Sequence, residues 1–449
     1  MRHFLILLLA WISFAAGAQD TTRISLLFAG DIMGHDSQIA SAYNPSTGQH
    51  DYTSCFASMK PYVEIADIAI GNLEVTLAGP PYKGYPQFSS PDALAVGLRE
   101  IGFDVLVTAN NHSVDRGRKG ILRTIRVLDS LGIPHTGTFA DEAARRNEYP
   151  LLLNKNGFTL ALLNYTYGTN GIPVPAPGMV NLIDTAQMRA DINKARQVKP
   201  DAIIVFMHWG NEYESLPTRG QRQLADYLFG LGADLVIGSH PHVLQPMEWR
   251  KDKNKLVVYS LGNFVSGQRK RYTDGGAMAY TELMKIRYKP DSVVTSIDSV
   301  GYFLQWVYRT EDERRDYYMI PVPLAEQNPS TLRGGSTSQA AFKQFVSDSR
   351  SLYGKHNINV PEIAQVQPDS SIRYRIHVAA ATNQTGGASL PTLDAYYFYG
   401  VDPIADETGV THVIGNFNDP GYAERLCKRL IEAGHEAKVV RYVNGAMTQ

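Results

Sequence analysis

Strand-like and helix-like runs of apolar residues alternate from residue 24 to about residue 264. Short apolar runs rich in β-branched residues predict buried strands, and apolar residues spaced three or four apart predict helices between them. This alternation is typical of a layered α/β domain. The expected strands are residues 24–28, 67–70, 103–107, 202–206 and 234–237, and the expected helices are residues 93–101, 120–129 and 221–229.

Two later runs differ because no helix pattern separates them. Residues 277–286 and 301–308 are both rich in aliphatic and aromatic side chains, which is typical of adjacent antiparallel strands. We expect them to form the outer part of a second sheet in the same domain. Residues 340–353 then predict an amphipathic helix, and the polar, proline-containing segment 365–371 is the expected domain boundary.

The C-terminal part of the chain predicts a separate small unit. Strands are expected at residues 374–378, 411–417 and 437–443, and a helix at residues 420–433 that ends before Gly434. Together these elements predict a compact α+β module. The apolar face of its helix consists of Ala423, Leu426, Cys427 and Leu430.

The first residues have the pattern of a targeting segment. Residues 1–3 are weakly positive, residues 4–14 are apolar, and residues 16–18 are small, as at a cleavage site. This order predicts a signal peptide over residues 1–18, with an uncleaved anchor helix as the alternative. No other stretch is apolar enough to span a bilayer. We expect an exported protein, periplasmic or associated with the cell envelope, with no transmembrane span in the mature chain.

Composition narrows the class of protein. The chain has 449 residues and a formal net charge of −1, so it has room for two or three domains with sizeable cores. No basic stripe stands out, which argues against nucleic acid as a partner. Cys55 and Cys427 lie far apart and indicate no disulfide framework, so we expect both to be buried hydrophobic residues.

Polar residues that can bind metal ions follow five of the expected strands. In open α/β sheets, sites form beyond the carboxyl ends of the strands. Carboxylate, amide and imidazole groups gathered there predict a centre for two divalent ions, Mn, Fe or Zn, that would assist attack by water or another nucleophile. The five blocks are residues 30–31, 71–74, 110–112, 208–210 and 238–242.

The carboxylates in these blocks are Asp31 and Glu74. Asp31 can hold a hard or borderline cation, and Glu74 has two oxygens with which it can bridge two ions. Each has an ordinary alternative, which is a turn or helix-capping Asp in one case and a surface Glu in the other. His35 and Asp36 lie in the same loop as Asp31 and could add a ligand.

Three histidines at two strand ends are the strongest signal for a metal site. Imidazole suits Zn, Mn and Fe, and the proline between His240 and His242 favours an extended loop whose rings face different ions. A single histidine such as His208 is more often structural than a ligand. Three of them beside two carboxylates favour a metal site.

The block after the third strand offers an acid–base group. Asn111 can bind a metal weakly through its amide oxygen, and His112 can protonate a leaving group or stabilise developing charge. Asp115 is placed in sequence to orient His112.

Three further side chains are candidates for contact with substrate. Glu212 and Tyr213 follow the His208 block, and Asn72 lies beside Glu74. The alternative for Glu212 is a solvated loop side chain, and the alternative for Asn72 is a turn residue.

Six motifs follow one another along residues 24–267: Gly30-Asp31, Gly71-Asn72-Leu73-Glu74, Ala109-Asn110-Asn111-His112, His208-Trp209-Gly210-Asn211-Glu212, Gly238-Ser239-His240-Pro241-His242 and Ser260-Leu261-Gly262-Asn263-Phe264. In this order they resemble the CapA family of capsule-synthesis proteins, which is associated with poly-γ-glutamate production. That family is similar to calcineurin-like metallophosphoesterases. The resemblance implies a four-layered α/β/β/α sandwich with a two-metal centre.

The resemblance also implies a role for each site residue. His112 would be the catalytic histidine, and Glu74 would bridge the two ions. Asp31 and His242 would hold the first ion, and Asn111, His208 and His240 would hold the second.

Two positions depart from the usual metallophosphoesterase pattern. Met33 stands where that pattern has a histidine ligand, and Ser113 stands where it has an acidic residue after the Asn-His pair. A thioether is a poor ligand for a hard ion. The first site is therefore expected to be weak, or to use His35 instead.

The C-terminal unit resembles a SPOR domain, a peptidoglycan-binding module. Residues 411–417, the helix that contains Tyr422-Ala423, and Gly434 carry this resemblance. The first helix of such a domain is not readable in residues 382–393. The resemblance implies that the unit tethers the chain to peptidoglycan.

These observations predict four segments, which are a signal peptide (1–18), a CapA-type domain (23–325), a helical segment with linker (326–370) and a SPOR-like domain (371–446). We expect an exported, metal-dependent hydrolase or transferase that acts on an envelope polymer or phosphoester in capsule or poly-γ-glutamate synthesis or processing. The first alternative is a non-catalytic assembly factor of a polymer-export complex. The second is a cell-wall adhesin whose C-terminal unit does the binding.

Overall fold

The structure is a computed structural model of the whole chain. It describes residues 20–289, 292–332, 335–363, 372–378, 401–406, 409–417, 420–432, 434–443 and 446–447. The predicted signal peptide, the linker at residues 365–371 and the segment 382–393 lie outside these described residues. Within them, no helix is both long and apolar enough to cross a membrane.

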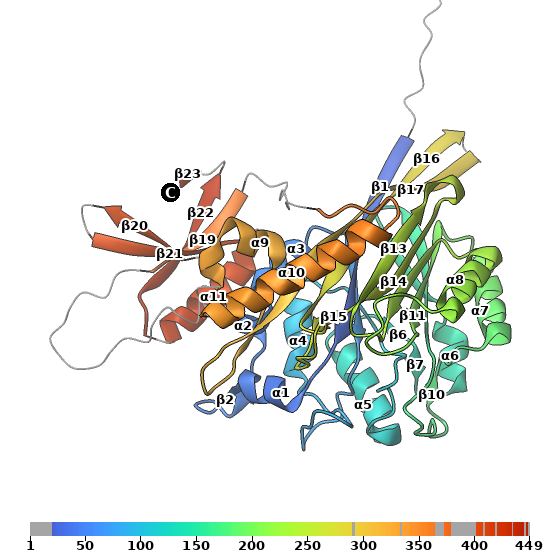
Figure 1. Ribbon diagram of the computed structural model, residues 1–449, viewed down its shortest axis with the longest axis horizontal. Coiled ribbons are helices and arrows are strands. Elements are labelled where there is room, and N and C mark those ends of the chain that lie inside the picture. Colours follow the sequence, from blue (N-terminus) through green and yellow to red (C-terminus); the bar gives the residue numbers. More distant parts are fainter. Residues whose placement is uncertain are drawn as a thin grey trace, which may run out of the picture.

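Two β-sheets form the main body of the protein (Figure 1). The eight-stranded sheet has the order β18-β17-β16-β1-β4-β5-β6, and β15 also pairs with β1. Its strands are β1 (Asp20–Ile32), β4 (Ile68–Leu73), β5 (Val105–Val107), β6 (His135–Thr136), β15 (Asn263–Val265), β16 (Gly275–Lys289), β17 (Ser292–Arg309) and β18 (Tyr317–Pro321).

The second, six-stranded sheet has the order β13-β14-β12-β11-β9-β8. The five strands expected to carry metal ligands are all present, three of them in the first sheet and two in the second. The strands of the second sheet are β8 (Leu151–Lys155), β9 (Phe158–Thr166), β11 (Ala202–His208), β12 (Leu235–Ser239), β13 (Leu244–Arg250) and β14 (Lys255–Leu261).

Successive side chains along a strand pack into two different cores, one on each face of the sheet. In β1, Leu26 and Phe28 join the core between the sheets, whereas Leu27 and Ala29 join the core on the outer face. This period of two follows from the pleat of a strand. In the second sheet, Ile204 of β11 likewise faces the inter-sheet core while its neighbours face outward.

Helices cover the outer face of each sheet. α4 (Ala93–Glu100) and α5 (Gly117–Ser130) contribute to the outer core of the first sheet, and α7 (Thr185–Gln197) and α8 (Arg219–Leu231) contribute to that of the second. The layer order is therefore α/β/β/α, which confirms the predicted fold class. α8 begins at Thr218, whose side chain accepts from the backbone of Gln221 in a capping box.

The strands that precede the site are parallel within each sheet. β1, β4 and β5 run in one direction, as do β9, β11, β12 and β14 in the other sheet. Their carboxyl ends therefore lie at one edge of each sheet, and the loops that follow can meet there.

One expectation about strand arrangement is wrong. β16 and β17 are antiparallel neighbours as predicted, but they extend the first sheet and are not part of a second one. β16 pairs with β1 from Asp20 to Ala29, whereas the pairing of β1 with β4 begins only at Leu26. The long β1 strand thus has a second edge whose backbone groups need partners, and β16 supplies them.

α10 (Ser336–His356) contains the predicted amphipathic helix and packs against β13 and β17 (Figure 1). Its residues Phe342, Phe345 and Tyr353 belong to the same core as the strands of the two sheets. The helical segment after residue 325 therefore contributes directly to the core of the α/β domain.

The C-terminal unit has the predicted strands and helix. α11 (Pro420–Glu432) packs Leu426 and Leu430 against Ile376 and Ile414 of the sheet. Cys427 is buried in this small core, and Cys55 is buried in the outer core of the first sheet. Both are free thiols, as expected. The sheet has the order β20 (Val401–Asp406), β21 (Gly409–Phe417), β19 (Ile372–Val378), β22 (Ala437–Val443) and β23 (Ala446–Met447).

Candidate metal centre

Asp31 reaches the site because the end of β1 lies directly against the loop after β14. Asp31 N donates to Gly262 O at 2.9 Å. A Cβ atom at Gly30 would lie only 2.0 Å from the same carbonyl oxygen, so no side chain fits at this position. Glycine at position 30 therefore permits the close approach that brings the Asp31 carboxylate into the site.

Glu74 is the central carboxylate of the site. It follows β4, its side chain is completely buried, and neither of its carboxylate oxygens has a hydrogen-bond partner among the described residues. Oε1 lies 3.5 Å from His208 Nε2 and 3.8 Å from His242 Nε2. Burial, followed by the nearby charge of Asp31, raises the pKa of Glu74 well above its ordinary value.

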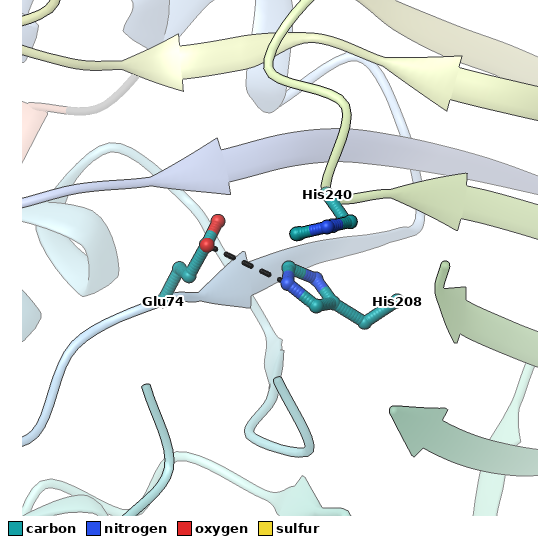
Figure 2. Close-up of side chains that lie close together, drawn as sticks. All are labelled: Glu74, His208 and His240. Atoms are coloured by element: carbon teal, nitrogen blue, oxygen red, sulfur yellow. Dashed lines mark ion pairs between the residues drawn. The ribbon is translucent and has the colours of Figure 1, made fainter. Parts of the chain in front are cut away.

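Figure 2 shows the Glu74 carboxylate directed toward the rings of His208 and His240. Ligand atoms of these three buried residues all lie within 4.8 Å of one another. Asn111 Oδ1 lies 2.6 Å from His208 Nε2, which adds the predicted amide oxygen to this group. Ser239 Oγ donates to Met207 O, so it can accept from His208 Nδ1, which leaves Nε2 unprotonated and directed toward Asn111 Oδ1 and Glu74 Oε1.

The environment keeps two of these rings neutral. Burial, followed by the charge of His240, lowers the pKa of His208 well below its usual value. Burial, followed by the charge of His242, lowers the pKa of His240 to about 3. A metal ion binds only the unprotonated ring nitrogen, so both imidazoles remain competent ligands in neutral and mildly acidic solution.

A second group consists of Asp31, Glu74 and His242, whose ligand atoms also lie within 4.8 Å of one another. His242 Nδ1 lies 3.0 Å from Asp31 Oδ2 and 3.1 Å from Asn263 Oδ1. Burial lowers the pKa of His242, but the hydrogen bond to Asp31, the charges of Asp31 and Glu212 and the bond to Asn263 together raise it above its ordinary value. Burial likewise opposes ionisation of Asp31, yet His242 holds the pKa of that carboxyl below its ordinary value.

The two groups share Glu74, and their chemistry fits a pair of cations. A buried carboxylate without hydrogen bonds is costly unless a positive charge lies beside it. The ring nitrogen His240 Nδ1 is also buried without a partner among the described residues. Nitrogen and oxygen donors of this kind suit Mn, Fe or Zn.

The loop that carries His240 and His242 adopts an uncommon backbone. Its φ angles are 98° at His240 and 58° at His242, in the region that favours glycine. Such conformations cost about 1–3 kcal/mol each and occur at functional sites. The surrounding contacts hold both rings toward Glu74 in spite of this cost.

His112 and Asp115 form the predicted pair. His112 Nδ1 donates to Asp115 Oδ2 at 2.7 Å, and the same oxygen accepts from Phe88 N at 2.7 Å. The edge of the Phe88 ring packs on His112 with centroids 4.6 Å apart. Ser113 stands where the metallophosphoesterase pattern has an acidic residue. Its hydroxyl donates to Thr108 O within the same loop. Asp115 and Phe88 thus fix the orientation of the imidazole.

Asn72 lies beneath the ligands and has no exposed surface. Its Nδ2 donates to Asp31 Oδ1 at 2.9 Å, and its Oδ1 accepts from Asn110 Nδ2 at 3.3 Å. The side chain holds Asp31 in position, as residues behind metal ligands commonly do. Its contact with substrate stays a prediction.

Met33, His35 and Asp36 do not contribute to the two groups. Met33 is buried in the outer core of the first sheet. His35 Nδ1 is occupied by Gly267 N and lies 3.1 Å from Gln38 Oε1, while Asp36 pairs with Lys83 on the surface. The group of Asp31, Glu74 and His242 therefore has one protein ligand fewer than the group of Glu74, His208, His240 and Asn111.

Glu212 and Tyr213 lie at the protein surface beside His242, and this surface is called the entrance to the centre. Glu212 is exposed, and the Tyr213 ring lies 6.3 Å from the ring of His242. Burial, followed by the charge of Glu212, raises the pKa of Tyr213 to about 12. This placement is compatible with the expected substrate contact.

One residue beside the centre was not predicted from the sequence. Tyr167 packs its ring 4.5 Å from His240. Tyr167 follows β9, a strand that ends at the same sheet edge as β11. Tyr167 could have been predicted by looking for polar residues after β9, as was done for the other strands. Asn263 belongs to the sixth sequence motif, and the structure places its side chain against His242.

Comparison with known proteins decides the family. The family described as "Bacterial capsule synthesis protein PGA_cap" matches residues 25–268, just over half of the chain. The chain belongs to this family. All of the metal-ligand candidates lie inside the matched segment.

Two relatives in this family are similar over more than half of the chain. "Capsule biosynthesis protein CapA" of Bacillus anthracis is 30% identical over 279 residues, which cover 59% of this chain and 65% of that protein. "PGA biosynthesis protein CapA" of Bacillus subtilis (strain 168) is 30% identical over 58% of this chain and 68% of its own length. The chain thus spans about two thirds of these relatives.

Among solved structures, the calcineurin-like phosphoesterase YfkN from Bacillus subtilis aligns with 74% of this chain and 99% of its own. The TM-score is 0.41 and the sequence identity is 13%.

Replacement of Glu74 by Gln should strongly reduce metal binding. The amide removes the negative charge shared by both ligand groups, so we expect affinity for Mn or Zn to fall at least about 100-fold. Elemental analysis of purified protein and calorimetric titration of the metal-free protein would measure this. Glu214→Gln, an exposed change in a nearby loop, is the matched control. Equal metal content in Glu74→Gln and wild type would contradict the assignment.

The lowered pKa of His35 should make the protein less stable as the pH falls. Burial, opposed by Gln38 and reinforced by the charge of His242, lowers its pKa to about 4, against 6.5 in the unfolded chain. The unfolded chain therefore binds a proton that the fold does not, and stability is lost as pH falls from 6.5 to about 4, by up to about 3 kcal/mol.

His35→Asn should make this loss shallower when urea unfolding of the chelator-treated protein is measured at pH 7, 5.5 and 4.5. His356→Asn, at the exposed end of α10, should retain the wild-type slope. Parallel curves for wild type and His35→Asn would show that His35 is not the group responsible.

Proposed function

We propose that this protein is an exported metal-dependent enzyme that processes an anionic polymer of the cell envelope. The observation that carries the proposal is the unpartnered Glu74 carboxylate, shared by two groups of buried ligands. Membership of the capsule synthesis family supports a polymer of the capsule or poly-γ-glutamate type as the substrate. The reaction is hydrolysis or transfer at a phosphoester or acyl bond of that polymer.

Asp31 and His242 would hold one divalent ion, Asn111, His208 and His240 would hold another, and Glu74 belongs to both ligand groups. When bound, such ions would supply Lewis-acid chemistry for attack by water or another nucleophile near neutral pH. His112 belongs to neither ligand group, and its Nδ1 donates a hydrogen bond to Asp115 Oδ2. Its Nε2 atom would donate a proton to the leaving group, with the ring held in place by Phe88.

His112→Ala should abolish turnover while leaving metal content unchanged. Loss of a positioned acid typically costs about 10²–10⁴-fold in rate, and His112 belongs to neither group of metal ligands. The measurement is hydrolysis of a phosphodiester and a phosphomonoester by the Mn- or Zn-loaded protein. Asp115→Asn should give a smaller loss with an altered pH profile, because it disturbs only the orientation of the ring. Full turnover by His112→Ala would exclude this role.

A second candidate function is that of a non-catalytic assembly factor in a polymer-export complex. The observation that favours it is Met33, which is buried in the outer core and leaves one ligand group with only Asp31, Glu74 and His242. A single tightly bound ion with no turnover, and a cellular role unaffected by His112→Ala, would favour this function over the enzyme.

The C-terminal unit is proposed to hold the protein on peptidoglycan. α11 covers one face of its sheet, and the opposite face presents Arg375, His377 and Tyr442. His377 Nε2 lies 2.8 Å from the Tyr442 hydroxyl, and the Arg375 guanidinium lies over the Tyr442 ring. Such a face offers hydrogen-bond donors and an aromatic surface to a glycan.

Tyr442→Ala should therefore weaken binding of the full chain to purified cell-wall sacculi by about fivefold or more, because it removes the ring shared by these contacts. Co-sedimentation would measure the bound fraction. Lys428→Ala, an exposed change on α11, should bind as wild type does. Equal sedimentation of all three proteins would remove the support for tethering through this face.

A further inference from the structure

Each ligand group has a tyrosine ring packed on one of its histidines. Tyr167 lies 4.5 Å from His240, and Tyr213 lies 6.3 Å from His242. Tyr167 is 47% exposed and Tyr213 is partly exposed, so both reach the surface beside the centre. The two rings therefore mark the side from which a substrate approaches the ligands.

Lys270 is the cationic side chain at this entrance. Its Nζ lies 3.8 Å from the centre of the Tyr213 ring. Within the residues that the structure describes, Lys270 is exposed and forms no ion pair. A cation over an aromatic face is attracted by the ring without losing its charge, so Lys270 remains available to an anion.

The residues on either side of Lys270 are held by other contacts. The Arg269 guanidinium donates to Ser266 O and Gln268 O and lies over the Tyr317 ring. Arg271 pairs with Asp348 of α10. The loop is thereby anchored on both sides, and Lys270 is directed to Tyr213.

Tyr213 is held through its ring and its backbone. Lys270 lies over the ring. Tyr213 N also donates to Pro241 O at 2.8 Å, which ties this loop to the His240–His242 segment. Lys270 is therefore connected to the ligand His242 through a single packed ring.

We propose that Lys270, positioned on Tyr213, binds an oxyanion of the substrate, a carboxylate or a phosphate, next to the group that reaches the metal ligands. This inference rests on the proposed function, because it assigns the class of substrate for the same site. Glu212 is the acidic group at the entrance and repels an anion from the hydroxyl side of Tyr213. A negatively charged unit is therefore directed to the Lys270 side.

Binding titrations with the full, Mn-loaded chain test this proposal without requiring turnover. One probe is a short γ-linked glutamate oligomer, which carries carboxylates, and the other is inorganic phosphate. Lys270→Met should weaken binding of at least one probe about fivefold at low salt, with the difference shrinking at high salt. Lys270→Arg should restore binding in part.

Arg271→Met is the matched control. It removes the same charge from the neighbouring residue, whose side chain is paired with Asp348 of α10. We expect it to bind both probes as wild type does. A loss confined to the oligomer identifies a carboxylate as the recognised group, and a loss confined to phosphate identifies a phosphate. Equal losses in Arg271→Met and Lys270→Met, no loss in Lys270→Met, or no measurable binding to wild type would overturn the proposal.

The metal content of every variant separates this inference from the proposed function. If wild type binds metal and loses turnover in His112→Ala, but Lys270→Met binds both probes normally, only the inference fails. If wild type binds no metal, the proposed function fails, and the same titrations on the metal-free chain still decide whether Lys270 binds an anion.

Discussion

The site depends on the cost of burying the Glu74 carboxylate. This group has no exposed surface and no hydrogen-bond partner among the described residues, and a second carboxylate, Asp31, lies close to it. Two buried acids side by side are unfavourable unless cations or protons compensate them. His208 and His240 resist protonation in the same environment. Divalent cations are the group that the arrangement fits, because they would satisfy the acids and the neutral imidazoles together.

The fold makes this concentration of ligands available by joining two sheets at their carboxyl edges. Close contact at Gly30 and Gly262 brings the end of β1 to the second sheet. Asn164 of β9 makes a further link, since its Oδ1 accepts from Ala109 N at 2.7 Å and its Nδ2 donates to Phe206 O at 3.1 Å. The loop that carries Asn111 and His112 is thereby tied to the strand that carries His208, and the ligand positions are held by both cores.

The centre and its entrance have different chemistry. The ligands are buried and fixed by hydrogen bonds, whereas the entrance consists of exposed tyrosines, Glu212 and Lys270. Met33 concerns the centre alone, because it is buried in the outer core of the first sheet. The proposed catalytic and scaffolding functions therefore differ in what they require of Met33 and His112, and the anion site proposed at Lys270 fits both.

The sequence by itself determined the layered α/β class and the five strand ends that carry possible ligands, because each is encoded locally by periodicity and by the polar residues that follow each strand. The division of these ligands into two groups was implied by the family resemblance. The tertiary structure alone decided that β16 joins the first sheet, that Asn72 supports Asp31, that Tyr167 packs on His240 and that Lys270 lies over Tyr213. These features depend on pairing and packing between segments far apart in the chain, for which no local pattern carries information.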